Sequence, residues 1–507
     1  MDRITKNILA SFFSKGWTAL LSLVCVPFYV KFLGVEAYGV IGVFVTMQAA
    51  LSLLDLGLGA AFTREVAQIS HRTGSPRNIP DLLRTLEVIY WIVALVMAIL
   101  IWGLGPVIAK HWLRLGALPP EEVAHAIGIA GFSFAMLWPT SLYNGGLTGL
   151  HRQVLLGWIT SIAAVLRVGG ALLALWLISP TLKTFFLAQA GANLFQTVAA
   201  GLCLWRCLPR VGAKPAFRIH LVRVLARFAI GMTGISVTSV VLTQLDKLVL
   251  SKTLPLEVFG YYTIAGTLAS GLYIFISPLF GVFFPKFSQL VALGDKASLV
   301  RLYHIGCQLM SVLILPVAAV MATFAKDLLL LWTHDANIAT RGALILSLMI
   351  VGNALNGLIN VPYAVELAYG WTNLALYTNI AAIIVCAPTL YFLSIQFGAV
   401  AGALVWVALT FFMMLTHISI SHRKYGLGSQ SRWYSADVGK PALGAIAVVI
   451  LVRFISPHIA LRTNSLLFFG AVTVIAGAAA IASAPAVRAL AVTAISAFFE
   501  RRVGRER

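Results

Sequence analysis

Long apolar runs follow one another along this chain, and they constrain its fold more than any other feature of the sequence. Most of them hold about 20 residues, which is the length at which a helix crosses ~30 Å of hydrocarbon. A membrane barrel would instead show alternating segments of about 10 residues. The composition agrees, because 60% of the 507 residues are hydrophobic and only 11% are charged. The sequence therefore predicts an all-α, polytopic membrane protein.

About 14 of these runs are long enough to cross the hydrocarbon, so the sequence predicts about 14 transmembrane helices. Lys15 and Trp17 occupy the places where a signal peptide would carry its apolar core and cleavage site, so we expect the first helix to be retained. The expected ranges are 8–30, 39–60, 86–108, 125–147, 156–178, 184–205, 228–250, 259–281, 305–325, 342–365, 374–395, 398–418, 441–456 and 465–484.

The net charge of +20 is spread unevenly over the segments between these runs. With both termini on one side, about two thirds of the Lys and Arg residues fall on that side, as the positive-inside rule requires of cytoplasmic segments. We therefore expect both termini in the cytoplasm and a location in the bacterial inner membrane. The basic charge then reflects topology and attraction to anionic membrane lipids, so no nucleic-acid partner is expected.

The sequence also contains an internal repeat. The segment VKFLGVEAYG, from Val30, aligns with a segment 221 residues further on, and TSIAAV, from Thr160, resembles TNIAAI, from Thr378. Six helices per copy would bring both copies into the membrane from the same side, as parallel repeats. The aligned residues of the first pair are Lys31, Leu33, Glu36, Tyr38 and Gly39 with Lys252, Leu254, Glu257, Phe259 and Gly260.

The repeat and the basic stretches between the apolar runs predict the domain organisation. We expect two parallel six-helix lobes joined by a linker that ends in an amphipathic interfacial helix, then a basic loop and two appended helices with a basic tail. The boundaries are 1–205 for the first lobe, 206–227 for the linker, 228–420 for the second lobe, 421–440 for the loop and 441–507 for helices 13 and 14 with the tail.

A polar stripe follows the first apolar run, where polar residues recur every three or four positions and so share one helical face. A similar stripe recurs 221 residues later. Such residues join helices within membranes, or they line a polar cavity. We predict a substrate cavity between the two helices. The stripes consist of Asn7, Ser11, Lys15, Thr18, Ser22 and Cys25, and of Ser236, Ser239, Thr243 and Asp246.

Charged residues inside the hydrocarbon are costly and therefore indicate function. Arg167 falls near the middle of the run 156–178, and we predict that it binds an anion such as a phosphate through its guanidinium group. The alternative is a structural ion pair with a carboxylate on another helix. Lys15 fits a ligand contact and a snorkelling side chain equally well.

Two carboxylates are candidates for ion coupling. Asp246 lies on the second polar stripe, where a proton or sodium site and a local ion pair fit equally well. Asp55 and Arg64 flank the end of the second apolar run, so a latch at that helix end is the alternative role of Asp55.

Motifs of common enzymes are absent from the sequence. It contains neither the GxxxxGK[ST] phosphate loop nor HExxH nor GxSxG. The five cysteines all lie in apolar runs and suggest neither disulfides nor a metal site. We expect no cofactor, no metal and no enzymatic activity.

Several segments resemble the polysaccharide transport proteins, the O-antigen flippase family, whose superfamily also holds multidrug extruders and the lipid II flippase. The first is LLDLGLGAAFTREVA, from Leu53, after PFYVKFLGVEAYGV, from Pro27, and weaker matches follow in LTGLHRQVLLGWI, FFPKFSQL and AYGWTNLALYTNI. The resemblance extends over residues 1–420. Its motif positions in this chain are Asp55, Gly57, Gly59 and Arg64.

The resemblance implies two lobes around a basic cavity that flip a polyprenyl-diphosphate-linked oligosaccharide to the periplasmic leaflet by alternating access, in the synthesis of surface polysaccharide. It implies this lipid-linked glycan as the partner, with other polysaccharide-assembly proteins as further candidates. The last two helices resemble the extra pair of the lipid II flippase, which leaves the substrate open. Two alternatives remain, a cation-coupled multidrug extruder of the same superfamily and a membrane glycan polymerase or ligase.

Overall fold

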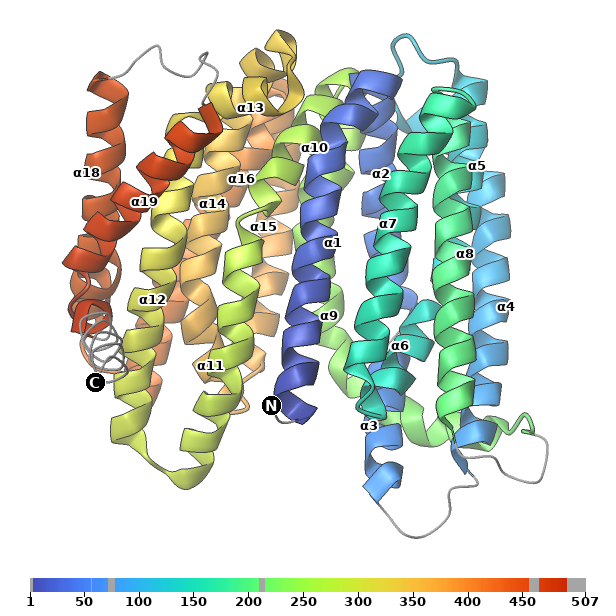
Figure 1. The fold of residues 1–507 in the computed structure, drawn as a ribbon, viewed down its shortest axis with the longest axis horizontal. Helices are drawn as coiled ribbons and strands as arrows, with labels where there is room; N and C mark the ends of the chain where they lie inside the picture. Colours follow the sequence, from blue (N-terminus) through green and yellow to red (C-terminus); the bar gives the residue numbers. More distant parts are fainter. Residues whose placement is uncertain (1–2, 56, 72–77, 209–214, 456–464, 490–507) are drawn as a thin grey trace, which may run out of the picture. The chain divides into compact units, whose positions relative to one another are not determined.

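The structure, a computed structural model, describes residues 3–55, 57–71, 78–208, 215–455 and 465–489. Almost all of these residues are helical, and no named strand occurs among them (Figure 1). The prediction of an all-α chain is confirmed.

Twelve helical segments of the described chain are long and apolar enough to cross a membrane. Their lipid-facing character shows in α4 (Asn78–Val107), where Ile92, Leu95 and Ile99 each leave more than half of their surface exposed. The apolar stretch Leu467–Ser483 is shorter. The chain is thus a multi-pass membrane protein, and the number of 14 spans stays a prediction.

The chain divides into two compact units, and the first comprises Met1–Ile264 with Asn379–Ala399. Within it, α5 packs against α4 and α8, and α7 packs against α1 and α8. The elements are α1 (Arg3–Leu33), α2 (Val35–Ser52), η1 (Leu53–Asp55), α3 (Leu58–His71), α4, η2 (Ile108–Trp112), α5 (Pro120–Leu137), α6 (Thr140–Gly149), α7 (Gln153–Leu177), α8 (Leu182–Cys207), α9 (Ile219–Thr253), the first part of α10 (Leu256–Ser270) and most of α15 (Asn373–Phe397).

Three of the expected helices are interrupted in the structure. The range 39–60 splits into α2 and α3, with Gly57 at φ 75° between them, a conformation that costs glycine little. The range 125–147 splits at Pro139, which has no N–H to continue the helical hydrogen bonds. The range 259–281 splits between Ser270 and Tyr273. Hydropathy could not show these breaks, because both sides of each break are apolar.

Helices α2 and α10 meet through equivalent positions of the sequence repeat. A Cβ on Gly39 would lie 2.6 Å from the backbone oxygen of Leu256, and a Cβ on Gly260 would meet the backbone oxygen of Val35. The offset of 221 residues makes Val35 equivalent to Leu256 and Gly39 equivalent to Gly260. Such a mutual contact is typical of a two-fold relation between two copies of one motif, and only glycine permits the close approach.

The second unit comprises Ala265–Thr378 with Val400–Arg507. In it, α14 packs against α11, α12, α13 and α16, while α18 and α19 pack against each other and against α12. Its elements, besides the rest of α10 and α15, are α11 (Tyr273–Leu293), α12 (Lys296–Thr323), α13 (Ala325–Thr333), α14 (Ala336–Ala368), α16 (Val400–Tyr425), α17 (Gln430–Arg432), η3 (Trp433–Gly439), α18 (Lys440–Ile455) and α19 (Ser465–Ser483).

Two segments expected between membrane helices are largely helical in the structure. Helix α9 begins at Ile219, so the end of the expected linker 206–227 continues directly into the next helix. The range expected as the loop 421–440 is largely helical and includes the π-helical segment η3. Its Trp433 and Asp437 are fully buried, and these buried contacts hold the segment in place.

Candidate functional site

The first unit contains a cavity of about 600 Å³ lined by α1, α6, α7 and α8. Seven of the ten described residues that line it are polar, and these include one cationic and no acidic residue. The ten residues are Thr18, Ala19, Asn144, Thr148, Gln153, Leu156, Gly157, Thr160, Arg167 and Gln196.

Helix α7 contributes half of this wall through one helical face. Gln153, Gly157, Thr160 and Arg167 follow one another at intervals of three, four or seven residues, so their side chains share a face. On α6, Asn144 and Thr148 are four residues apart and share a face in the same way. Polar residues at this spacing therefore bring a hydrogen-bonding surface to the cavity from two helices.

Helix α6 is held in position by a close crossing with α3. A Cβ on Gly145 would lie 2.7 Å from the backbone oxygen of Gly59, and a Cβ on Gly149 would lie 2.7 Å from that of Thr63. Glycines let two backbones approach in this way within a membrane. The crossing fixes the helix that carries Asn144 into the cavity.

Asp55, just before α3, joins α3 and α6 through hydrogen bonds. Its carboxylate accepts hydrogen bonds from the hydroxyls of Tyr90 on α4 and Ser141 on α6 and from the backbone N–H of Gly59. Three donors from three helices satisfy this carboxylate, so the geometry fits the latch. Its use in ion coupling stays a prediction. Arg64 lies on α3 with an exposed side chain.

Arg167 reaches Gln196 on α8, where its Nη2 donates a hydrogen bond of 2.5 Å to Oε1. Its Nε is buried and has no hydrogen-bond partner in the described part of the chain, and no described carboxylate forms an ion pair with it. The neighbouring backbone is braced by Tyr29 of α1, whose hydroxyl donates to the carbonyl oxygen of Val168 at 3.2 Å. The guanidinium group is thus held by an amide and keeps one N–H available.

Two further atoms in the same wall lack partners. The side-chain oxygens of Asn144 and Gln153 are buried and accept no hydrogen bond from any described residue. A buried polar atom without a partner costs about 1–3 kcal/mol. Three residues of the cavity wall, Arg167, Asn144 and Gln153, thus each have a side-chain atom beneath its surface whose hydrogen-bonding capacity no described residue uses.

The residues predicted for the first polar stripe have different fates. Thr18 lines the cavity together with Arg167. Ser22 is exposed, and its hydroxyl donates to the backbone oxygen of Thr18 at 2.9 Å. The side chain of Lys15 lies outside the described residues.

The second polar stripe, on α9, does not line this cavity. Ser236 and Thr243 are exposed, and the hydroxyl of Ser239 accepts a hydrogen bond of 3.1 Å from Asn379. The carboxylate of Asp246 accepts a hydrogen bond from the hydroxyl of Tyr262. Of the predicted cavity residues whose side chains the structure describes, Thr18 and Arg167 come together here, and a second wall formed by α9 stays a prediction.

Sequence reasoning missed Asn144, Thr148, Gln153, Thr160 and Gln196. For the two residues on α7, helical spacing from Arg167 was the available signal. For the residues on α6 and α8 no local signal existed, because their approach to α7 depends on how the helices pack. In the described chain, no group of three or more His, Cys, Asp or Glu side chains could hold a metal ion.

Comparison with known proteins gives a consistent result. The profile of a family described as "Polysaccharide biosynthesis protein" matches residues 4–291. The succinoglycan biosynthesis transport protein ExoT of Rhizobium meliloti (strain 1021) is 25% identical over 317 residues, which cover 62% of this chain and 59% of that protein. The chain thus matches less than two thirds of the length of this relative.

Two solved structures share the fold. One is the lipid II flippase MurJ in an inward closed conformation, with a TM-score of 0.71 and 13% identity, over 98% of this chain and 99% of the other. The second is an inward-facing multidrug resistance MATE family transporter of the MOP superfamily, with a TM-score of 0.62 and 15% identity, over 80% and 96%. At these identities the likeness concerns the fold alone.

Proposed function

Because the chain belongs to the polysaccharide biosynthesis protein family, as its sequence motifs predicted, we propose that it flips a polyprenyl-diphosphate-linked oligosaccharide from the cytoplasmic to the periplasmic leaflet of the bacterial inner membrane. Two lobes expose the bound glycan to one side at a time, and both termini lie in the cytoplasm. The name of the relative ExoT, a transport protein of succinoglycan biosynthesis, supports transport.

The observation that carries the proposal is the set of residues that line the cavity, which combines one guanidinium group with side-chain amides and hydroxyls. The guanidinium group of Arg167 can donate to a phosphate oxygen, while the side-chain amides of Asn144 and Gln153 can form hydrogen bonds with sugar hydroxyls. A charge-assisted hydrogen bond between guanidinium and phosphate is about twice as strong as a neutral one. The lipid-linked glycan offers both kinds of partner in one molecule.

Membrane physics explains why such a cavity is needed. Each polar group that loses water without gaining a hydrogen bond costs about 2–7 kcal/mol, so a glycan does not cross hydrocarbon unaided. Threonines, amides and a guanidinium replace that water along the cavity wall. The prenyl tail can remain in the lipid while the glycan crosses, because the tail is apolar and has no polar groups to desolvate.

The cavity favours this substrate over the cationic compounds that a multidrug extruder would carry. A cationic drug needs a carboxylate or an aromatic face, and the residues that line this cavity include neither. A membrane glycan polymerase or ligase is disfavoured because the matched relative is named as a transport protein. Resistance of cells with and without the protein to a panel of cationic drugs separates the extruder from the flippase.

Deletion and complementation test the proposed function. We expect lipid-linked oligosaccharide to accumulate on the inner leaflet of a deletion strain, and surface glycan to return with the wild-type gene. Arg167→Ala should abolish this return at an unchanged protein level. Arg301→Ala provides the control, because this exposed residue of α12 lies outside the cavity. Equal export by the Arg167→Ala and wild-type proteins would contradict the assignment.

A further inference from the structure

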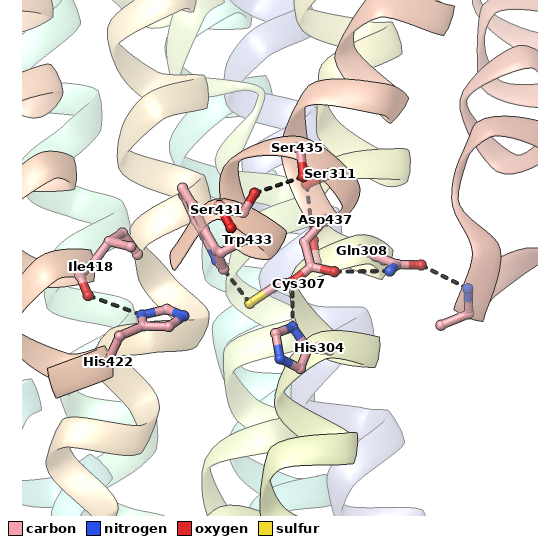
Figure 2. A network of polar contacts seen from close by, with 11 residues as sticks. His304, Cys307, Gln308, Ser311, Ile418, His422, Ser431, Trp433, Ser435 and Asp437 are labelled. Carbon is pink, nitrogen blue, oxygen red and sulfur yellow. Dashed lines mark hydrogen bonds and ion pairs between the residues drawn. The ribbon is translucent and has the colours of Figure 1, made fainter. Parts of the chain in front are cut away.

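The second unit contains a buried polar joint that the proposed function does not use. It consists of His304 and Gln308 on α12, Asp437 in η3, and the backbone N–H of Ala486 after α19 (Figure 2). His304, Gln308 and Asp437 are each at most 3% exposed, and Asp437 is fully buried. The joint fastens the segment before α18 and the segment after α19 to α12.

The hydrogen-bond directions in the joint follow from its chemistry. The N–H of Ala486 can only donate, and it gives a bond of 2.8 Å to Oε1 of Gln308. The amide of Gln308 is thereby oriented, and its Nε2 donates to Oδ1 of Asp437 at 2.8 Å. Oδ1 is therefore an acceptor, and the protonation state of the joint depends on His304 and on Oδ2 of Asp437.

His304 has one satisfied and one open ring nitrogen. Its Nδ1 is hydrogen-bonded to Oδ2 of Asp437, and its Nε2 is buried without a partner in the described chain. With Nδ1–H donating to an ionised Asp437, Nε2 carries a free lone pair, and the joint has a net charge of −1. A proton on Nε2 turns this into a neutral imidazolium–carboxylate pair, which removes an uncompensated buried charge.

The surroundings supply polar and titratable neighbours but no counter-ion. Tyr303 and Cys307 come from α12 itself, and His422 comes from α16, with its ring beside that of Tyr303. Glu366 of α14, another electrostatic neighbour of Tyr303, is bonded to His417 of α16 at 3.0 Å. In the described chain no Lys or Arg forms an ion pair with Asp437, so a proton is the available neutralising charge.

A short route connects this lone pair with the surface. Gly428, in the turn between α16 and α17, is exposed and has a φ of 93°. A Cβ on this residue would lie 3.1 Å from Nε2 of His304. One glycine without a side chain thus separates the open nitrogen from the surface.

We propose that the His304–Asp437 joint is a proton-binding site. A hydronium ion reaching the turn at Gly428 gives its proton to the lone pair of His304 Nε2 and leaves as water. The charge of the joint changes from −1 to zero, while Nδ1 stays bonded to Asp437. The site lies in the second unit and is distinct from Asp55 and Asp246.

Nitrogen NMR on the full-length protein in lipid nanodiscs, with ¹⁵N-labelled histidine, tests the proposal. On acidification we expect one buried histidine to change from the neutral to the imidazolium form at Nε2 alone. His304→Asn should remove this resonance. An asparagine amide lies close to the place of Nδ1 and can still donate to Asp437, so the joint and the fold should be retained.

Two further variants make the result decisive. His422→Asn should leave the His304 resonance in place, because Nδ1 of His422 donates its hydrogen bond to the carbonyl oxygen of Ile418 and not to Asp437. Asp437→Asn should keep His304 neutral at pH values where the wild type is charged. A His304 resonance that never changes form, or one that titrates identically in Asp437→Asn, would overturn the proposal. The experiment needs no glycan, so its outcome is independent of the proposed function.

Discussion

Asp55 accepts a hydrogen bond of 2.9 Å from the hydroxyl of Ser141, which ties the break between α2 and α3 to α6. Because α6 carries Asn144 and Thr148 into the cavity, a carboxylate outside the cavity determines where part of its wall lies. The motif that identifies the family thereby acts on the cavity indirectly.

This relation predicts a stability cost for Asp55→Ala. The change leaves the hydroxyls of Tyr90 and Ser141 without their acceptor, and we expect a loss of about 1–3 kcal/mol. Thermal unfolding in detergent measures it. Asp55→Ala and Tyr90→Phe remove the same hydrogen bond. In the double variant the loss of stability should therefore be smaller than the sum of the two single losses. Ser52→Ala, which removes only a local bond to Ala49, serves as the control, and additive losses would contradict the relation.

The close contact between α2 and α10 predicts that Gly39→Ala and Gly260→Ala are both destabilising. In each case the new methyl group would meet the backbone of the partner helix. The same change at Gly169 of α7, where nothing lies within 4 Å, should be neutral or stabilise by about 0.5–1 kcal/mol through helix propensity. Melting temperatures of the three variants check this. A destabilised Gly169→Ala protein with unchanged Gly39→Ala and Gly260→Ala proteins would refute the contact.

The unpaired oxygen of Asn144 predicts opposite effects on stability and transport. Asn144→Leu removes a buried acceptor without a partner, so the melting temperature should rise. Glycan export should fall at the same time, since a ligand group loses its place. Gln196→Leu is the matched change, and it should lower the melting temperature because Arg167 loses its acceptor. Full export by the Asn144→Leu protein would show that this oxygen does not contact the substrate.

The start of α12 predicts a pH dependence. Oδ1 of Asp295 accepts a hydrogen bond of 3.0 Å from the N–H of Ser298, and this bond lowers the pKa of Asp295 below its ordinary value of 3.8. A lowered pKa in the folded state contributes stability that is present above the unfolded pKa and is lost as the pH falls through the folded pKa. The protection factor of the Ser298 amide, which compares its exchange rate with that of an unstructured peptide at the same pH, should therefore fall on acidification below about pH 4.

Asp295→Asn separates the charge from the cap in this prediction. Asparagine caps a helix about as well as aspartate, so protection of Ser298 should persist and lose its dependence on acid. If protection of the Ser298 amide falls equally on acidification in the wild type and in Asp295→Asn, the pH dependence belongs to another group.

The sequence was informative wherever a contact is local. The spacing along α7 that leads from Arg167 to Thr160 and Gln153 is visible in the sequence, because helical periodicity places these residues on one face. The repeat identified equivalent residues of α2 and α10, and the structure shows that these equivalent positions contact each other. The helix break near Gly57 was missed, because a change of backbone direction between two apolar segments leaves hydropathy unchanged.

Contacts between distant segments were beyond sequence reasoning. His304 and Asp437 are separated by 133 positions, and Asp437 falls in a basic stretch that reads as a solvated loop. Its burial depends on the packing of η3 against α12. A local pattern does not report such packing, because the free energy of burying a carboxylate depends on the donors that other segments bring to it.

The sequence by itself determined that this chain is an all-α, multi-pass membrane protein of the polysaccharide biosynthesis family. Transfer of an apolar run into lipid is a local property, so hydropathy and motif residues suffice for it. Only the tertiary structure decided which polar atoms find partners. It left Arg167, Asn144 and Gln153 with open hydrogen-bonding positions and satisfied Asp55 completely. Pairing of polar groups is set by the meeting of several helices, and no single segment encodes that meeting.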